Sequence, residues 1–110
     1  MSLSRGEIYL VSPAPGKDPK RARTVVIVSR QTLCDSKADK VICAPINTHA
    51  DGRSTEIPVG PEEGLKHASV INCDQLILVP KSALTHYVGV LPPKTMSALR
   101  GAIRIALEVG

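Results

Sequence analysis

Aromatic side chains are scarce in this chain, which has two tyrosines, no phenylalanine and no tryptophan among its 110 residues. A binding surface built from rows of stacked aromatic rings is therefore excluded. Tyr9 lies in a strand-like run, where we expect a core position, and Tyr87 is the only other aromatic ring. Any recognition of a ligand must rest mainly on hydrogen bonds and charge.

Cysteines are also few. Cys34, Cys43 and Cys73 are an odd number and include no Cys-x-x-Cys pair, which argues against both a disulfide framework and a zinc site. Cys43 and Cys73 lie in apolar, strand-like runs, which favours small buried hydrophobic side chains. The alternative, a nucleophilic thiol, requires an electropositive pocket that the sequence does not indicate.

Long apolar runs are absent, because no stretch of 18 residues is free of charge and mostly apolar. The opening residues 1–8 lack the apolar core of a signal peptide. We therefore expect a cytoplasmic protein with no membrane contact. A length of 110 residues with 43% hydrophobic content predicts a single domain spanning residues 1–110.

Several catalytic motifs are missing as well. The sequence has no Gly-rich phosphate loop, no Gly-x-Ser-x-Gly and no His-Glu-x-x-His, so nucleotide-binding, serine-hydrolase and metalloenzyme interpretations have no support. We expect no metal and no cofactor. His49, His67 and His86 sit singly in loop-like segments, and two of them can act together only if the fold brings them close.

The most informative stretch of the sequence runs from Lys17 to Ser29. Four cations and one carboxylate between Lys17 and Arg23 leave a net charge of +3, which is most of the formal +4 of the whole chain. The β-branched run Val25–Val28 follows at once and predicts a strand covered on both faces. Arg23 is thus expected at the mouth of a rigid strand beside a basic loop, an arrangement that suits a polyanion such as a phosphate backbone. The alternative is a solvated loop kept polar for solubility.

Short strands separated by turn residues occupy most of the chain. Alternation and β-branched content predict strands at Glu7–Val11, 24–29, Lys40–Asn47, Thr55–Val59, Ser69–Asn72, Gln75–Val79 and Tyr87–Leu91, and a short helix at Gln31–Lys37. Pro45 lies inside the third strand and is expected to require a bulge or an edge position. The pattern predicts a mainly β (α+β) fold built as a small barrel.

The hydrophobic period changes to that of a helix near the C-terminus. Met96, Leu99, Ile103, Ala106 and Leu107 recur at helical spacing, and Pro93 suits the first turn. A helix that packs over one open end of the barrel is the main interpretation. The alternative is a helix that contacts another subunit.

Polar residues gather at the predicted strand ends. They are Arg23, the Asn47-Thr48-His49 corner and the Asn72-Cys73-Asp74 corner, with Asp18 in the basic loop. These side chains suffice for cleavage of RNA without a metal. A base must take the proton of the 2′-hydroxyl, fixed donors must stabilise the charge on phosphorus, and the leaving 5′-oxygen must gain a proton. Arginine can do the second task bidentately.

The order of these segments resembles the MazF/Kid/PemK family of bacterial toxin–antitoxin toxins, which are small endoribonucleases. The Arg-Gly-Glu-Ile opening, an arginine that begins the second strand and Cys-Asp-Gln after a later strand carry the resemblance together. The matching segments are Arg5–Val11, Arg23–Ser29, Val41–Thr48, Thr55–Val59, Gly64–Leu65, Ser69–Gln75 and the final helix.

The resemblance implies an SH3-like barrel of the CcdB/PemK type with a C-terminal helix, a homodimer, a groove for single-stranded RNA, and a cognate antitoxin that occupies the groove. Arg23 matches the family's catalytic arginine, and Asp18 falls where many members carry a loop glutamate. Asp74 matches an aspartate that serves as base in some members. Asn47 completes the expected catalytic set, and the expected RNA-binding residues are Lys17, Lys20, Arg21, Thr48, His49 and Asn72.

Three departures from the family pattern are visible. Thr24 follows Arg23 where proline is usual, Asn47 replaces Thr or Ser, and Ile77 stands where arginine is frequent. An amide donates a hydrogen bond but cannot act as acid or base. The alternative function is therefore an altered or inactive member that works as a binding module, either like a gyrase inhibitor or in regulation.

Overall fold

The computed structural model describes residues 2–12 and 22–110, which form seven strands, two α-helices and two short 3₁₀ helices. In chain order these are β1 Glu7–Val11, β2 Arg23–Ile27, α1 Gln31–Asp35, β3 Lys40–Asn47, β4 Glu56–Val59, η2 Pro61–Glu63, β5 Ser69–Asn72, β6 Ile77–Pro80, η3 Lys81–Ala83, β7 His86–Val90 and α2 Pro93–Leu107.

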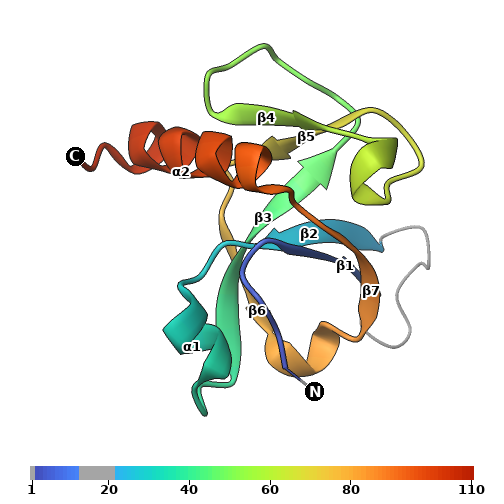
Figure 1. Ribbon diagram of the computed structural model, residues 1–110, viewed down its shortest axis with the longest axis vertical. Coiled ribbons are helices and arrows are strands. Elements are labelled where there is room, and N and C mark those ends of the chain that lie inside the picture. Colours follow the sequence, from blue (N-terminus) through green and yellow to red (C-terminus); the bar gives the residue numbers. More distant parts are fainter. Residues whose placement is uncertain (1, 13–21) are drawn as a thin grey trace.

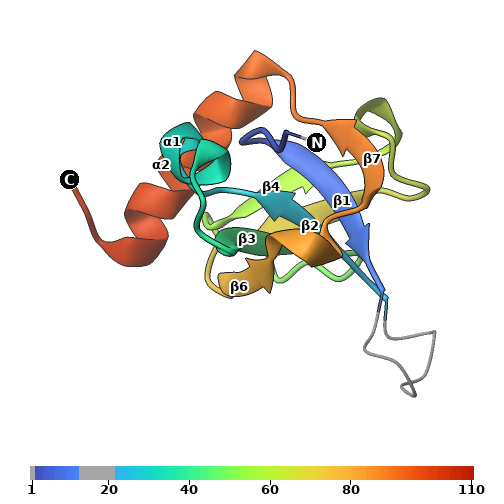
Figure 2. The same cartoon turned by 90° about the horizontal axis from the view of Figure 1, so that it is seen from below.

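All seven strands join one antiparallel sheet in the order β4-β5-β3-β2-β1-β7, and β6 pairs with the first half of β3. The sheet curves into a half-barrel, with α2 lying against β4 and β5 on one side and α1 near the opposite end (Figure 1). The turned view shows the strong twist between β1 and its neighbours (Figure 2). The predicted mainly β fold with a C-terminal helix is confirmed.

Two buried clusters hold the sheet, one on each face. The first core cluster lies under α2, and the second lies between the other face, α1 and the N-terminal residues. Alternate residues of β2 serve both, since Val26 joins the first cluster while Val25 and Ile27 join the second. The prediction that this strand is covered on both faces is confirmed. Full burial of each such side chain is worth roughly 1.5–3 kcal/mol.

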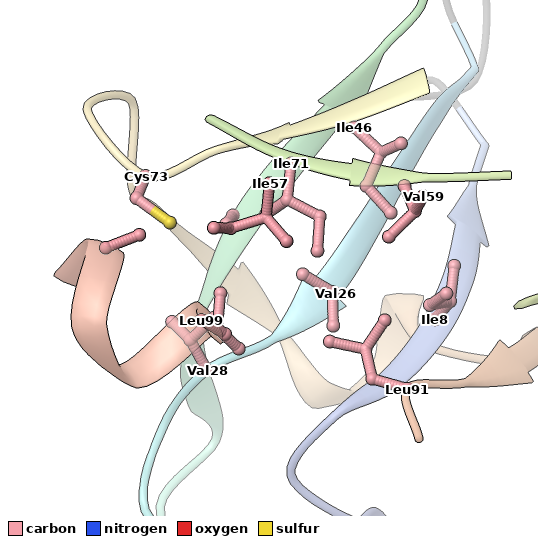
Figure 3. Packing of buried hydrophobic residues seen from close by; sticks show 12 residues of the cluster. Ile8, Val26, Val28, Ile46, Ile57, Val59, Ile71, Cys73, Leu91 and Leu99 are labelled. Carbon is pink, nitrogen blue, oxygen red and sulfur yellow. The ribbon is translucent and has the colours of Figure 1, made fainter. Parts of the chain in front are cut away.

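Helix α2 covers the first core cluster through Leu99 and Ala102, with Met96 and Ile103 packed beside them. Figure 3 shows Leu99 directed toward the same space as Val28 and the residues of β3 to β5. The expected packed helix is therefore confirmed, with one correction. Leu107, which the helical period places in the apolar stripe, is exposed, because the last turn of α2 extends beyond the sheet (Figure 1).

Pro45 occupies a local edge position within β3, which is one of the two arrangements expected. Ile42 directs both its N–H and its C=O toward β2 and Ser29, so alternation directs Pro45 to the other side of β3. On that side β6 pairs with β3 only as far as Cys43, and β5 begins at Ile46. Pro45 lies in the gap between these two partners, where no ladder hydrogen bond is lost.

Some element ends also differ from the sequence-based prediction. Strand β2 begins one residue earlier, at Arg23, and ends at Ile27 because the next two N–H groups share a single acceptor, the C=O of Ile42. Strand β6 begins at Ile77, since Gln75 belongs to a turn that donates its N–H to the C=O of Asn72. Helix α1 ends at Asp35, and β7 runs from His86 to Val90.

Candidate functional site

The structure brings Arg23 and Asn47 together at the ends of two paired strands. Strand β2 begins at Arg23, β3 ends at Asn47, and the register pairs Thr24 with Ile46, so Arg23 and Asn47 are the next neighbours across the pair. By alternation both point to the face of the second core cluster. Both residues are exposed, because the apolar cluster ends before it reaches them.

A surface cavity of about 650 Å³ lies over these strand ends. Among the described residues that line it, Arg23 carries the only ionisable side chain, and amides and hydroxyls supply further hydrogen-bond donors. The lining residues are Ala22, Arg23, Thr24, Pro45, Ile46, Asn47, Thr48, Gln75 and Ile77. A guanidinium carried on a strand end, with neutral donors and no carboxylate among the described lining residues, suits a phosphate group. We call this the Arg23 cavity.

Asp74 does not line the Arg23 cavity. Its Oδ2 accepts a hydrogen bond from Oγ1 of Thr55 at 2.6 Å, and Nη1 of Arg53 lies 3.6 Å from the same oxygen. Its backbone N–H donates to Oδ1 of Asn72 at 2.9 Å. Since the Thr55 hydroxyl is on a buried residue, the Asp74 carboxylate serves the joint between β4 and the β5–β6 turn.

The remaining expected RNA-binding residues fall in three places. Thr48 lines the Arg23 cavity, whereas Asn72 is half-buried at the end of β5 and is occupied by the Asp74 backbone. His49 is exposed, and its Nε2 lies 2.9 Å from Oδ1 of Asp51. Four expected residues, Lys17, Asp18, Lys20 and Arg21, lie outside the described residues. The roles of all these residues stay predictions.

The loop after Thr48 is held by a single carboxylate. Glu56 accepts the backbone N–H of Asp51 at 3.0 Å and that of Arg53 at 2.9 Å. These backbone hydrogen bonds lower the pKa of Glu56 below its ordinary value of 4.5. The loop that carries His49 and Asp51 is thus tied to the start of β4.

A second cavity, of about 550 Å³, lies on the opposite face of the same strand ends. We call it the His67–His86 cavity, because the fold brings these two histidines to its wall from separate loops and strands. Sequence reasoning had left open whether any histidines meet. The lining residues are Leu10, Thr24, Ile46, Thr48, Gly64, Leu65, Lys66, His67, Ser69, His86, Tyr87 and Val88.

Two sets of residues turn out to be structural. All three cysteines are buried, and burial raises the pKa of Cys43 to about 12 and that of Cys73 to about 11. Tyr9 is also buried, and its hydroxyl donates to Oε1 of Glu7. Burial, then the charge of Glu7, raises the pKa of Tyr9 to about 12. The predictions of buried cysteines and a core tyrosine are confirmed.

Residues 4–107 match the model of a protein family described as the PemK-like, MazF-like toxin of type II toxin–antitoxin systems. The chain belongs to this family. The resemblance read from the sequence is thereby confirmed, and the PemK/MazF-like toxin assignment applies to nearly the whole chain.

Individual proteins and structures similar to this chain extend the family assignment. Endoribonuclease MazF3 of Mycobacterium tuberculosis is 34% identical over 89 residues, which cover 81% of this chain and 85% of the relative. The structure of the Mycobacterium tuberculosis toxin MazF-mt6 superposes with a TM-score of 0.81 at 30% identity, covering 94% of this chain and 98% of that one. A mycobacterial endoribonuclease in complex with its cognate antitoxin gives a TM-score of 0.82 at 25% identity, with 99% and 98% covered. The endoribonuclease class expected from the sequence is confirmed at the level of the family.

The fold also places residues that sequence reasoning did not select for the PemK/MazF-like site. Gln75 and Ile77 both line the Arg23 cavity, on either side of Leu76, which packs on the first core cluster. Gln75 belongs to the Cys-Asp-Gln segment that carries part of the family resemblance, so the sequence did contain a signal for it. Ile77 supplies apolar surface, and Arg23 is the one cation among the described residues that line the cavity.

Within residues 2–12 and 22–110, no helix is long and apolar enough to cross a membrane. The same residues contain no group of three or more histidine, cysteine, aspartate or glutamate side chains arranged to hold a metal ion.

Proposed function

We propose that this PemK/MazF-like toxin cleaves single-stranded RNA in the Arg23 cavity by attack of the 2′-hydroxyl on the adjacent phosphorus. The observation that supports this most directly is the cavity itself, where Arg23 is anchored at the start of β2 and is the only ionisable side chain among the described lining residues. Fixed donors that meet developing charge are the largest single contribution in many enzymes.

The steps follow from this geometry. The 2′-oxygen loses its proton to a base and forms a bond to phosphorus, and the bond from phosphorus to the 5′-oxygen breaks. The products are a 2′,3′-cyclic phosphate and a 5′-hydroxyl, whose oxygen takes up a proton. Arg23 stabilises the charge on the phosphate oxygens bidentately, and the amide of Asn47 donates a hydrogen bond beside it.

The base role falls to one of two carboxylates, Asp18 or Asp74. We favour Asp18, since Oδ2 of Asp74 already accepts the hydroxyl of Thr55 and Asp74 does not line the cavity. No step is assigned to a metal, because the cavity's described lining offers guanidinium, amide and hydroxyl groups rather than carboxylate, imidazole or thiolate ligands.

Incubation of the pure protein with a long unstructured RNA, with and without EDTA, tests this function. We expect cleavage at discrete positions in both samples. Asn47→Thr, which restores the family's usual residue, is expected to keep or raise the rate. Intact RNA under both conditions would refute the proposal.

A second candidate function rests on the C-terminal end of the chain. Ile105, Leu107 and Val109 are 58%, 55% and 56% exposed, which is the kind of apolar surface that a gyrase inhibitor or a regulatory binding module uses. A gyrase supercoiling assay distinguishes this candidate from RNA cleavage. Inhibition of gyrase by a protein that leaves RNA intact would favour the second function.

We also propose a homodimer. Within the described part of the chain, strands β4 and β7 each have a partner on one side only, and a paired apolar couple, Ile42 and Leu78, is 38% and 65% exposed. Light scattering across a dilution series is expected to give twice the chain mass of 11.7 kDa. Leu78→Lys should lower that mass toward the monomer, whereas a wild-type protein that stays monomeric would refute the dimer.

The partner protein, the location in the cell and the domain organisation are proposed from the family assignment alone. We infer that a cognate antitoxin binds this chain as one binds the mycobacterial relative, that the toxin acts in the cytoplasm, and that residues 1–110 work as one domain. Co-purification with the product of a neighbouring gene tests the antitoxin partner.

A further inference from the structure

Four adjacent strands supply one wall of the His67–His86 cavity. The sheet register places His86 beside Leu10, Leu10 beside Thr24, and Thr24 beside Ile46, in one row across β7, β1, β2 and β3. This row lies on the face of the first core cluster, at the point where the cluster ends. Leu10 and Ile46 give the cavity an apolar floor built from rigid strands, with Thr24 and His86 beside it in the same row.

The described side chains that give this cavity its charge are all basic. Lys66, His67 and His86 are exposed at its wall, and no described lining residue is a carboxylate. Hydroxyl groups of Thr24, Thr48 and Ser69 add neutral hydrogen-bond partners. An apolar floor with a basic and hydroxylic rim suits a ligand that joins a flat, partly apolar ring to an anionic group.

The loop that closes the cavity is docked tightly on β7. Gly64 adopts a positive φ of 94°, and a Cβ at this position would overlap the C=O oxygen of Val88. The buried carboxylate of Glu63 accepts the N–H of Gly60 at 2.6 Å. The residues that follow, Leu65 to His67, are therefore presented by an anchored loop, and the cavity exists before any ligand binds.

The two cavities lie on opposite faces of the same strand ends and share three lining residues. Thr24, Ile46 and Thr48 line both, so an extended ligand that leaves Arg23 reaches the second cavity after passing one strand end. A volume of about 550 Å³ lies within the range of roughly 300–1,000 Å³ that holds small ligands, which is enough for one nucleotide.

We propose that the His67–His86 cavity binds one nucleotide of the RNA next to the cleaved bond. The base lies on the floor of Leu10, Ile46 and Leu65, and the phosphate is met by Lys66 and the two histidines. This inference rests on the proposed function. A segment of the antitoxin is the competing occupant, and RNA is favoured because the cavity shares a wall with the Arg23 cavity.

Nuclear magnetic resonance titration with the four ribonucleoside 5′-monophosphates tests the site without any cleavage, because these probes contain no internucleotide bond. The ¹⁵N-labelled full chain is titrated as wild type, as Lys66→Ala/His67→Ala, and as the control Arg100→Ala, which removes an exposed cation of α2 that lines neither cavity. Lys66 and His67 are exposed, so the double variant is expected to fold.

We expect at least one mononucleotide to shift the amides of residues 64–69 and 86–88, and the double variant to bind it about tenfold more weakly. Arg100→Ala should bind as wild type does. On long RNA the double variant should change the preferred nucleotide at one position beside the cut. Equal affinity in the double variant, or shifts confined to the Arg23 cavity, would overturn the proposal.

Two further outcomes separate this inference from the function on which it rests. Mononucleotide binding at residues 64–69 without any RNA cleavage would refute the proposed ribonuclease while the nucleotide site stands. An antitoxin peptide that shifts these amides when no mononucleotide does would assign the cavity to the antitoxin and overturn the nucleotide site.

Discussion

Asp74 is the residue for which a structural role and a chemical role predict different results. The hydroxyl of buried Thr55 donates to Oδ2 of Asp74 at 2.6 Å. Asp74→Ala leaves this hydroxyl without its acceptor, which costs about 1–3 kcal/mol. The exposed contact with Arg53 at 3.6 Å adds only about 0–1 kcal/mol. Because about 1 kcal/mol shifts the Tm of a domain of this size by roughly 4 °C, the two losses together predict a fall of about 4–16 °C.

The conservative variant Asp74→Asn decides between the two roles. Its side-chain oxygen still accepts the Thr55 hydroxyl, so we expect a smaller fall in Tm and nearly wild-type cleavage per folded molecule, measured by thermal unfolding and single-turnover kinetics. Thr55→Val is the matched control, and Asp74→Ala should cost less on that background. An Asp74→Asn enzyme with unchanged Tm and a rate lowered about 100-fold would show that Asp74 takes the proton, against this reasoning.

Three further predictions concern the loops and the core. Gly64→Ala should lower the free energy of unfolding in urea by at least about 2 kcal/mol, since it combines a left-handed φ with a clash on β7. Gly101→Ala, whose Cβ meets open space in α2, should instead raise it by about 0.5–1 kcal/mol. Equal effects of the two variants would contradict this. Because the pKa of Glu56 is lowered in the fold, its contribution to stability is present above pH 4.5 and lost as the pH falls through the lowered value. Glu56→Gln should therefore flatten the acid limb of Tm against pH, and an unchanged limb would argue against the carboxylate. The buried thiols, whose pKa values are raised, should react with an aromatic disulfide reagent only on unfolding, and fast labelling of the native protein would refute their core role.

Local pattern was enough to locate most of the fold. The β-branched run after Arg23 and the alternation around Ile57 predict strands because their side chains pack on both faces or one face of a sheet. The helical period from Met96 onward predicts α2 for the same reason. The exceptions are at element ends, such as Leu107, where the extent of the sheet decides exposure and no local pattern records it.

Pro45 shows why pairing partners are harder to predict than strands. The rule that proline avoids central strands holds for a residue that must donate to a neighbour. Here two short strands share one side of β3, so the missing N–H falls between them. The change of partner depends on the distant segments β5 and β6, and the sequence around Pro45 does not contain it.

The candidate site also combines parts that the sequence predicts with parts that depend on distant segments. Arg23 and Asn47 are brought together by the direct pairing of β2 and β3, which the order of strands makes predictable. Asp74 was selected by type and position, but its partner Thr55 comes from another strand end and gives it a structural contact. The His67–His86 cavity needs five separate segments to meet, and single histidines in the sequence give no sign of it.

The most direct test of the account is cleavage of a long RNA by wild-type protein and Arg23→Ala in EDTA, with analysis of the product ends. We expect the wild type to leave a 2′,3′-cyclic phosphate and a 5′-hydroxyl. Arg23→Ala should slow the chemical step on the order of 100-fold or more, and Arg23→Lys should recover only part, because a point charge cannot bridge two phosphate oxygens. An unimpaired Arg23→Ala protein, or a 5′-phosphate on the downstream product, would contradict the account.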